Sequence, residues 1–105
     1  MAMSMIAALR PLITQAVSYS TATTITNAFS AQTYCIRVAA NSACHVLVSE
    51  ASNVVAATTS NAMFLPANWV DYIIVSPGQK LSVIQAATNG LVTATAGTLL
   101  VTEMV

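Results

Sequence analysis

Apolar and polar residues alternate through the middle of the chain with the two-residue period of a β-strand. One such run covers residues 34–39 and a second covers residues 44–48, with a break in the pattern at 40–42. Two alternating runs joined by a short loop are typical of an antiparallel hairpin. We therefore predict that the two runs pair, with Arg37 opposite Cys44.

A second hairpin is predicted further along. Residues 69–76 hold the strongest run of β-branched and aromatic side chains in the sequence. Residues 76–79 then read as a β-turn, because Pro77 presets φ at its second position and Gly78 allows a positive φ at its third. We expect residues 81–86 to return from this turn as the partner strand.

The other segments complete an all-β pattern. Four more stretches have the Thr-, Val-, Ile- or Leu-rich composition of strands: residues 12–19, 22–29, 91–95 and 98–104. Turns are expected at 88–90 and 96–97, and residues 50–66 read as a long connection with a short strand or one turn of helix. Only residues 1–9 have a helical composition.

These predictions give roughly seven to nine short strands, which favours a β-sandwich or a jelly-roll-like barrel. We divide the chain into residues 1–30, an N-terminal arm or a pair of outer strands, and residues 31–105, the β-sandwich domain. If residues 1–30 are an arm, they would add a strand to the sheet edge of a neighbouring molecule.

Charge changes this picture more than any motif does. The chain has three Lys and Arg residues and three Asp and Glu residues, and its net charge is zero. A folded monomer of this mass exposes roughly 5,600 Å², which leaves about one charge per 900 Å². Such a surface favours association, so we expect much of it to be covered in an assembly.

The same composition argues against membranes and nucleic acid as partners. The longest uncharged stretches are interrupted throughout by Thr, Ser, Asn and Gln, whereas a membrane helix needs about 20 mostly apolar residues in a row. The start of the chain has no basic region typical of a secretory signal. The three cations, Arg10, Arg37 and Lys80, are far apart, so no basic patch is predicted.

Catalytic chemistry has little support, and we expect neither an enzyme nor a cofactor. His45 is the only histidine, and no paired-carboxylate, triad or phosphate-loop pattern occurs. Cys35 and Cys44 lie on predicted neighbouring strands, which leaves open a disulfide or two buried free thiols. A zinc site of Cys35, Cys44 and His45 is disfavoured, because neighbouring residues on a strand point to opposite faces.

Four residues are candidates for an interface. Arg37 alternates with Ile36 and Val38, so its side chain points away from the core, where an unpaired guanidinium under a partner would be costly. Glu50, Asp71 and Glu103 are the carboxylates available to it in this or a neighbouring subunit, and Asp71 is preferred because it also lies mid-strand. The other two candidates, Trp69 and Tyr72, would line an interface or form the platform of a carbohydrate-binding β-sandwich.

A family resemblance adds to these inferences. Five segments resemble the small β-rich head proteins of tailed bacteriophages: residues 36–38, 44–46, 57–66, 71–84 and 100–104. The resemblance spans residues 33–105. It implies a virion structural protein, made in the host cytoplasm, that decorates the capsid exterior and cements neighbouring major capsid subunits. It also implies a homo-oligomer, most often a trimer. Another small virion component, such as a head fibre base, neck or tail protein, is the alternative within this class.

Overall fold

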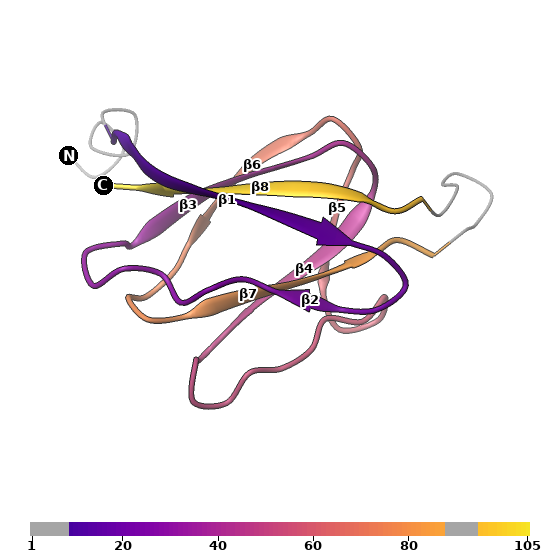
Figure 1. Ribbon diagram of the computed structural model, residues 1–105, viewed down its shortest axis with the longest axis horizontal. Coiled ribbons are helices and arrows are strands. Elements are labelled where there is room, and N and C mark those ends of the chain that lie inside the picture. The colour runs from indigo at the N-terminus through magenta and orange to yellow at the C-terminus, as the bar shows by residue number, and fades with distance from the viewer. Residues whose placement is uncertain (1–8, 88–94) are drawn as a thin grey trace.

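Two four-stranded antiparallel sheets pack face to face in the computed structural model, which describes residues 9–87 and 95–105 (Figure 1). The front sheet has the order β1 (Pro11–Tyr19), β8 (Gly97–Met104), β3 (Cys35–Ala40) and β6 (Val70–Ile74). The back sheet has the order β2 (Thr24–Ile25), β7 (Lys80–Gln85), β4 (Cys44–Ser49) and β5 (Met63–Leu65). The predicted all-β class and the β-sandwich are confirmed.

The hydrophobic core lies between the two sheets. Ile36 and Val38 on β3 and Val101 on β8 face Leu81 and Val83 on β7, and all five side chains are fully buried. These residues occupy alternate positions of their strands, so the period-2 pattern in the sequence marks the inner face of each sheet.

Both predicted hairpins are wrong in their pairing, although their strands are present. β3 lies in the front sheet and β4 in the back sheet, so Arg37 is not opposite Cys44. β6 and β7 are likewise divided between the sheets. The chain passes from one sheet to the other in each connection, at the edge of the core. The apolar sides of the two connected strands then face each other across the core and are buried. A side-by-side hairpin would leave those two apolar sides on one face, still needing a cover.

The turn at residues 76–79 is confirmed, although it joins strands of different sheets. The Gln79 amide donates to the Ser76 carbonyl oxygen at 3.2 Å, and Gly78 has a φ of 83°. The Gly78 amide also donates to the carbonyl oxygen of Phe29, which ties the turn to the end of the segment after β2. The turn therefore anchors one end of the sandwich.

The first strands of the chain are edge strands of this same sandwich. β1 pairs along its length with β8, and β2 pairs with β7, so both join strands that belong to residues 31–105. The final strand, predicted at 98–104, is confirmed as β8. The predicted turn at 88–90, most of the predicted strand at 91–95 and nearly all of the helical stretch at 1–9 fall outside the described residues. No described segment forms an apolar helix of membrane-spanning length.

Candidate interaction surface

The outer faces of the two sheets differ in how they are covered. The connection between β4 and β5 runs across the outer side of the back sheet (Figure 1). Ser82 on β7, fully buried, donates from its hydroxyl to the carbonyl oxygen of Val55 in this connection at 3.0 Å. Thr23 donates in the same way to the carbonyl oxygen of Ala57, whose side chain is also fully buried. The back sheet is thus covered by its own chain.

The outer face of the front sheet, called the open face below, is built from three cross-strand rows. Paired residues of antiparallel strands point to the same side, so the register defines each row. In order from β1 or β8 to β6, the rows are Ala16, Leu100, Ala39 and Val70; Thr14, Thr102, Arg37 and Tyr72; and Met104, Cys35 and Ile74. Ten of these eleven side chains are uncharged, and Arg37 is the exception. Three of them, Thr102, Met104 and Cys35, are buried.

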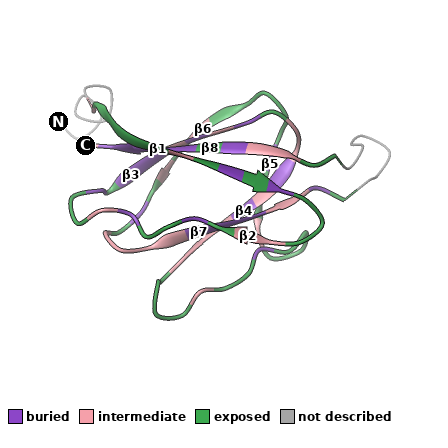
Figure 2. Cartoon of the chain, viewed as in Figure 1, coloured by how far each residue is buried: buried purple, intermediate pink, exposed green. Residues whose placement is uncertain are grey.

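Large apolar side chains are exposed mainly on the strands of the front sheet. Of the twelve that are exposed in the described chain, eight lie on front-sheet strands or directly before them. They are Leu12, Ile13, Tyr34, Trp69, Val70, Tyr72, Ile74 and Leu100. Ile74 is 78% exposed, and Figure 2 shows exposed stretches along β6 and the first half of β1. Four of the eight, Leu100, Val70, Tyr72 and Ile74, belong to the rows of the open face. Exposed apolar side chains gathered on one face are typical of a protein-binding site.

Arg37 lies in the central row of the open face. Its Cα partners are Tyr72 on β6 and Thr102 on β8, and its side chain is half-buried. Within residues 9–87 and 95–105, the guanidinium makes neither an ion pair nor a side-chain hydrogen bond. Among the described residues this cation therefore has no charged partner, and it lies in a row with Thr14, Thr102 and Tyr72 between two apolar rows.

Asp71, the carboxylate preferred as a partner, does not meet Arg37 within the chain. Asp71 pairs with Val38, which faces the core. Its side chain therefore leaves β6 on the core side of the sheet, opposite to the side of Arg37. Its Oδ1 accepts the backbone N–H of Tyr72 at 2.9 Å. Because β6 is an edge strand, this bond occupies an amide that would otherwise be open to a foreign strand, a known way of protecting a sheet edge.

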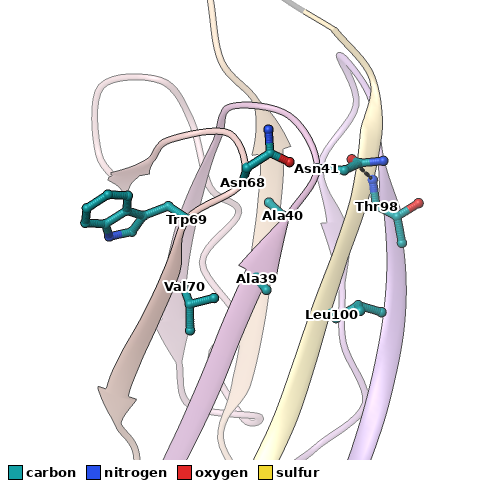
Figure 3. Close-up of a pocket in the computed structure, with 8 residues that line it drawn as sticks. All are labelled: Ala39, Ala40, Asn41, Asn68, Trp69, Val70, Thr98 and Leu100. Atoms are coloured by element: carbon teal, nitrogen blue, oxygen red, sulfur yellow. Dashed lines mark hydrogen bonds between the residues drawn. The ribbon is translucent and has the colours of Figure 1, made fainter.

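A hollow of about 420 Å³ occupies the end of the open face nearest the β3–β4 connection. Its lining residues are Ala39, Ala40, Asn41, Asn68, Trp69, Val70, Thr98 and Leu100 (Figure 3). The small alanine side chains leave the space, and the larger Val70 and Leu100 stand on either side of Ala39. The Asn41 side chain is fixed, since its Oδ1 accepts the Thr98 amide at 2.9 Å.

Trp69 and Tyr72 do not form one platform around this hollow. Tyr72 belongs to the central row beside Arg37 and is not among the lining residues. The Trp69 indole extends to the side of β6, away from Ala39 and Leu100 (Figure 3). Both rings are more than half exposed. The geometry thus places them as separate contact points of one face.

The two cysteines are free, and the structure separates them. Both are buried, but Cys35 belongs to the outer side of the front sheet, whereas Cys44 on β4 belongs to the core between the sheets. Burial raises the pKa of the Cys44 thiol to about 11, while the nearby Tyr19 hydroxyl acts in the opposite direction. His45 points to the other side of β4 and bonds through Nδ1 with the Ala62 carbonyl oxygen. Among the described residues, no group of metal-binding side chains occurs.

Sequence reasoning did not identify Leu100, Val70 and Ile74 as members of the surface. On β8, the charged Glu103 occupies an inward position together with the core residues Leu99 and Val101. The sequence pattern therefore does not reveal which side of this strand faces the core. The signal available in the sequence was Arg37, whose side chain was expected on the outer side of its strand. Once the strand register is known, the residues that pair with Arg37, Ala39 and Cys35 can be assigned to the same face. That register is a long-range property that the strand pattern alone does not contain.

Comparison with protein-family models, with curated proteins and with solved structures gives no match to this chain.

Proposed function

We propose that this chain is a non-catalytic structural protein of a phage particle, which decorates the capsid exterior by binding neighbouring major capsid subunits. The observation that carries the binding role is the difference between the sheets. One outer face is covered by the chain's own connection, and the other exposes a row of apolar side chains in a protein with only six charges. The sequence resemblance then favours a capsid as the partner.

The energetics favour a covered open face. Removing apolar surface from water contributes about 25 cal/mol per Å², so covering side chains the size of Leu100, Tyr72 and Ile74 favours association by several kcal/mol before entropy is counted. A cement protein needs such a surface and needs no reactive groups. The alternative virion roles, in a head fibre base, neck or tail, would use the same face on a different partner.

Co-sedimentation with capsids assembled from the major capsid protein of the same phage tests this function. The matched variants are Leu100→Lys on the open face and Ile25→Lys on the back sheet. They are matched because Leu100 and Ile25 are each 44% exposed and each lies in a strand. We expect Leu100→Lys to weaken binding about tenfold or more, since a charge would be desolvated at the interface, and Ile25→Lys to bind like the unmodified protein.

Two other results would contradict the proposal. Failure of the unmodified protein to bind capsids, with binding to isolated tails or necks, would move it to the alternative virion role. Sugar-dependent Trp69 fluorescence without capsid binding would support the carbohydrate-binding alternative instead.

We also propose that the protein forms a homo-oligomer, most often a trimer, at micromolar concentration. The low charge of the whole surface and the phage resemblance support this state. Sedimentation equilibrium measures it directly. A long-lived monomer at that concentration would contradict self-association and would leave capsid binding unaffected.

A further inference from the structure

We propose that the partner of the open face presents a side-chain carboxylate to Arg37, so that this arginine selects the partner. The inference rests on the proposed function, because it names the chemistry that the capsid surface must supply at this face. It is carried by two observations: the position of Arg37 among apolar rows, and the engagement of every carboxylate in its own chain.

The first step concerns the side-chain carboxylates of the chain itself, which number three. Glu103 is buried on the core side of β8, and its Oε1 accepts bonds from the amide and hydroxyl of Ser30 and from the Thr33 hydroxyl. Asp71 faces away from Arg37 and accepts the Tyr72 amide. Glu50 follows the end of β4 in the other sheet and accepts from the Gln79 side chain. None of the three is placed to pair with Arg37.

The second step concerns the cost of covering Arg37. In its own row Arg37 lies between Thr102 and the exposed Tyr72. The exposed apolar side chains of the adjacent rows nearest to it are Leu100 and Ile74 on the flanking strands. A partner that covered these apolar groups would also remove water from the guanidinium. A desolvated, unpaired charge is strongly unfavourable, whereas a carboxylate matches the planar fork of arginine with two parallel hydrogen bonds. A purely apolar partner surface would therefore fit this face poorly.

Two other occupants fit less well. A second copy related by a twofold axis through the face would bring two Arg37 guanidinium groups together, and like charges at an interface are unfavourable. A nucleic acid would need several cations along its phosphates, and the three rows of the face contain one. A protein surface with an acidic residue among apolar ones is the occupant that matches.

The test measures binding of Arg37→Met and Arg37→Lys to the same capsids, with Lys80→Met as the matched control. Lys80 is the half-buried cation of the back sheet, paired with Ser49 on that sheet's outer side. We expect Arg37→Met to weaken binding about 30-fold or more, because the partner's carboxylate would be left buried without a cation. Arg37→Lys should recover part of the affinity, because lysine keeps the charge but not the fork. Lys80→Met should bind like the unmodified protein.

Thermal melts of the free variants separate folding from binding. The Arg37 guanidinium makes no hydrogen bond or ion pair within the described chain, so we expect Arg37→Met to melt like the unmodified protein. Capsid binding by Arg37→Met as tight as the unmodified protein would overturn this inference, while loss of binding in Leu100→Lys would still support the proposed function. If Arg37→Met lost self-association and kept capsid binding, a second copy of the chain would be the occupant of the open face. That result would also overturn the inference. No capsid binding by the unmodified protein would remove the proposed function and this inference together.

Discussion

The Tyr19 hydroxyl donates a hydrogen bond of 2.6 Å to the carbonyl oxygen of Ser42. Tyr19 ends β1 at the edge of the front sheet, and Ser42 lies in the connection that carries the chain from β3 to β4. The same hydroxyl lies 2.7 Å from the Ser42 Oγ. This contact fixes the corner where the chain leaves one sheet for the other, and Gly97, opposite Tyr19, has no side chain to obstruct it.

Removing this hydroxyl should destabilise the fold. Tyr19 is 2% exposed, so Tyr19→Phe would leave the Ser42 carbonyl oxygen poorly satisfied. We expect a loss of about 1–2 kcal/mol in the free energy of unfolding, measured by urea titration. Tyr34→Phe is the control, because Tyr34 is 64% exposed and should change stability by less than about 0.5 kcal/mol. Equal urea midpoints for the two variants would contradict a structural role for the corner contact.

The corner also explains what could not be predicted from the sequence. Local sequence information located five strands: alternation indicated β3 and β4, while β-branched composition and turn residues indicated β6, β7 and β8. It did not indicate partners, since a short break at residues 40–42 suits a hairpin as well as a crossing between sheets. Both edges of β3 are taken by β8 and β6, which come much later in the chain. Only these long-range pairings exclude β4 from the place beside β3.

The candidate surface could be predicted only in part, because its rows also depend on long-range strand pairing. Arg37 was placed on the outer side from its neighbours Ile36 and Val38, and the structure agrees. Asp71 was expected to meet it within the chain or across subunits, and the register of β6 excludes the contact within the chain, because a shift of one residue reverses the face.

Gly78 should tolerate asparagine better than valine. Its φ of 83° lies in the left-handed region, and a Cβ added there would meet no atom within 4 Å. Backbone strain therefore acts without a steric clash. We expect Gly78→Val to lower the free energy of unfolding by about 1–3 kcal/mol, and Gly78→Asn to cost clearly less, because asparagine adopts this conformation more readily. Chemical denaturation of both variants measures the difference, and a valine variant as stable as the asparagine one would contradict the turn geometry.

Glu103 should make stability depend on pH in the acid range. Burial acts to raise the pKa of this carboxyl, but hydrogen bonds from Ser30 and Thr33 outweigh it, so the pKa lies below its usual 4.5 in the folded state. A lowered folded pKa contributes stability that is present above the unfolded value and lost as pH falls through the folded one. Stability should therefore decline as the pH drops below about 4.5.

The variant Glu103→Gln isolates this contribution. At pH 7 it should be less stable than the unmodified protein by about 1–2 kcal/mol, because neutral acceptors bind the Ser30 and Thr33 donors more weakly. The difference should shrink in urea titrations at progressively lower pH. Glu50→Gln is the control, because Glu50 is exposed and its substitution should change the free energy of unfolding at pH 7 by less than about 0.5 kcal/mol. A constant gap between Glu103→Gln and the unmodified protein from pH 7 to pH 3 would contradict the prediction.

The two thiols should be reduced and unreactive in the folded protein. Cys44 is fully buried with a pKa of about 11, so at pH 8 only about one thiol in a thousand is the reactive thiolate. Burial also raises the pKa of Cys35, which is 7% exposed. We expect slow modification by a thiol reagent in native buffer and two thiols per chain in guanidinium without reductant. The Cys35→Ala variant assigns the rates, because its one remaining thiol should react only as the core opens. Fewer than two thiols after unfolding would mean a disulfide, and fast native reaction of Cys44 would mean that the core beside Tyr19 is open.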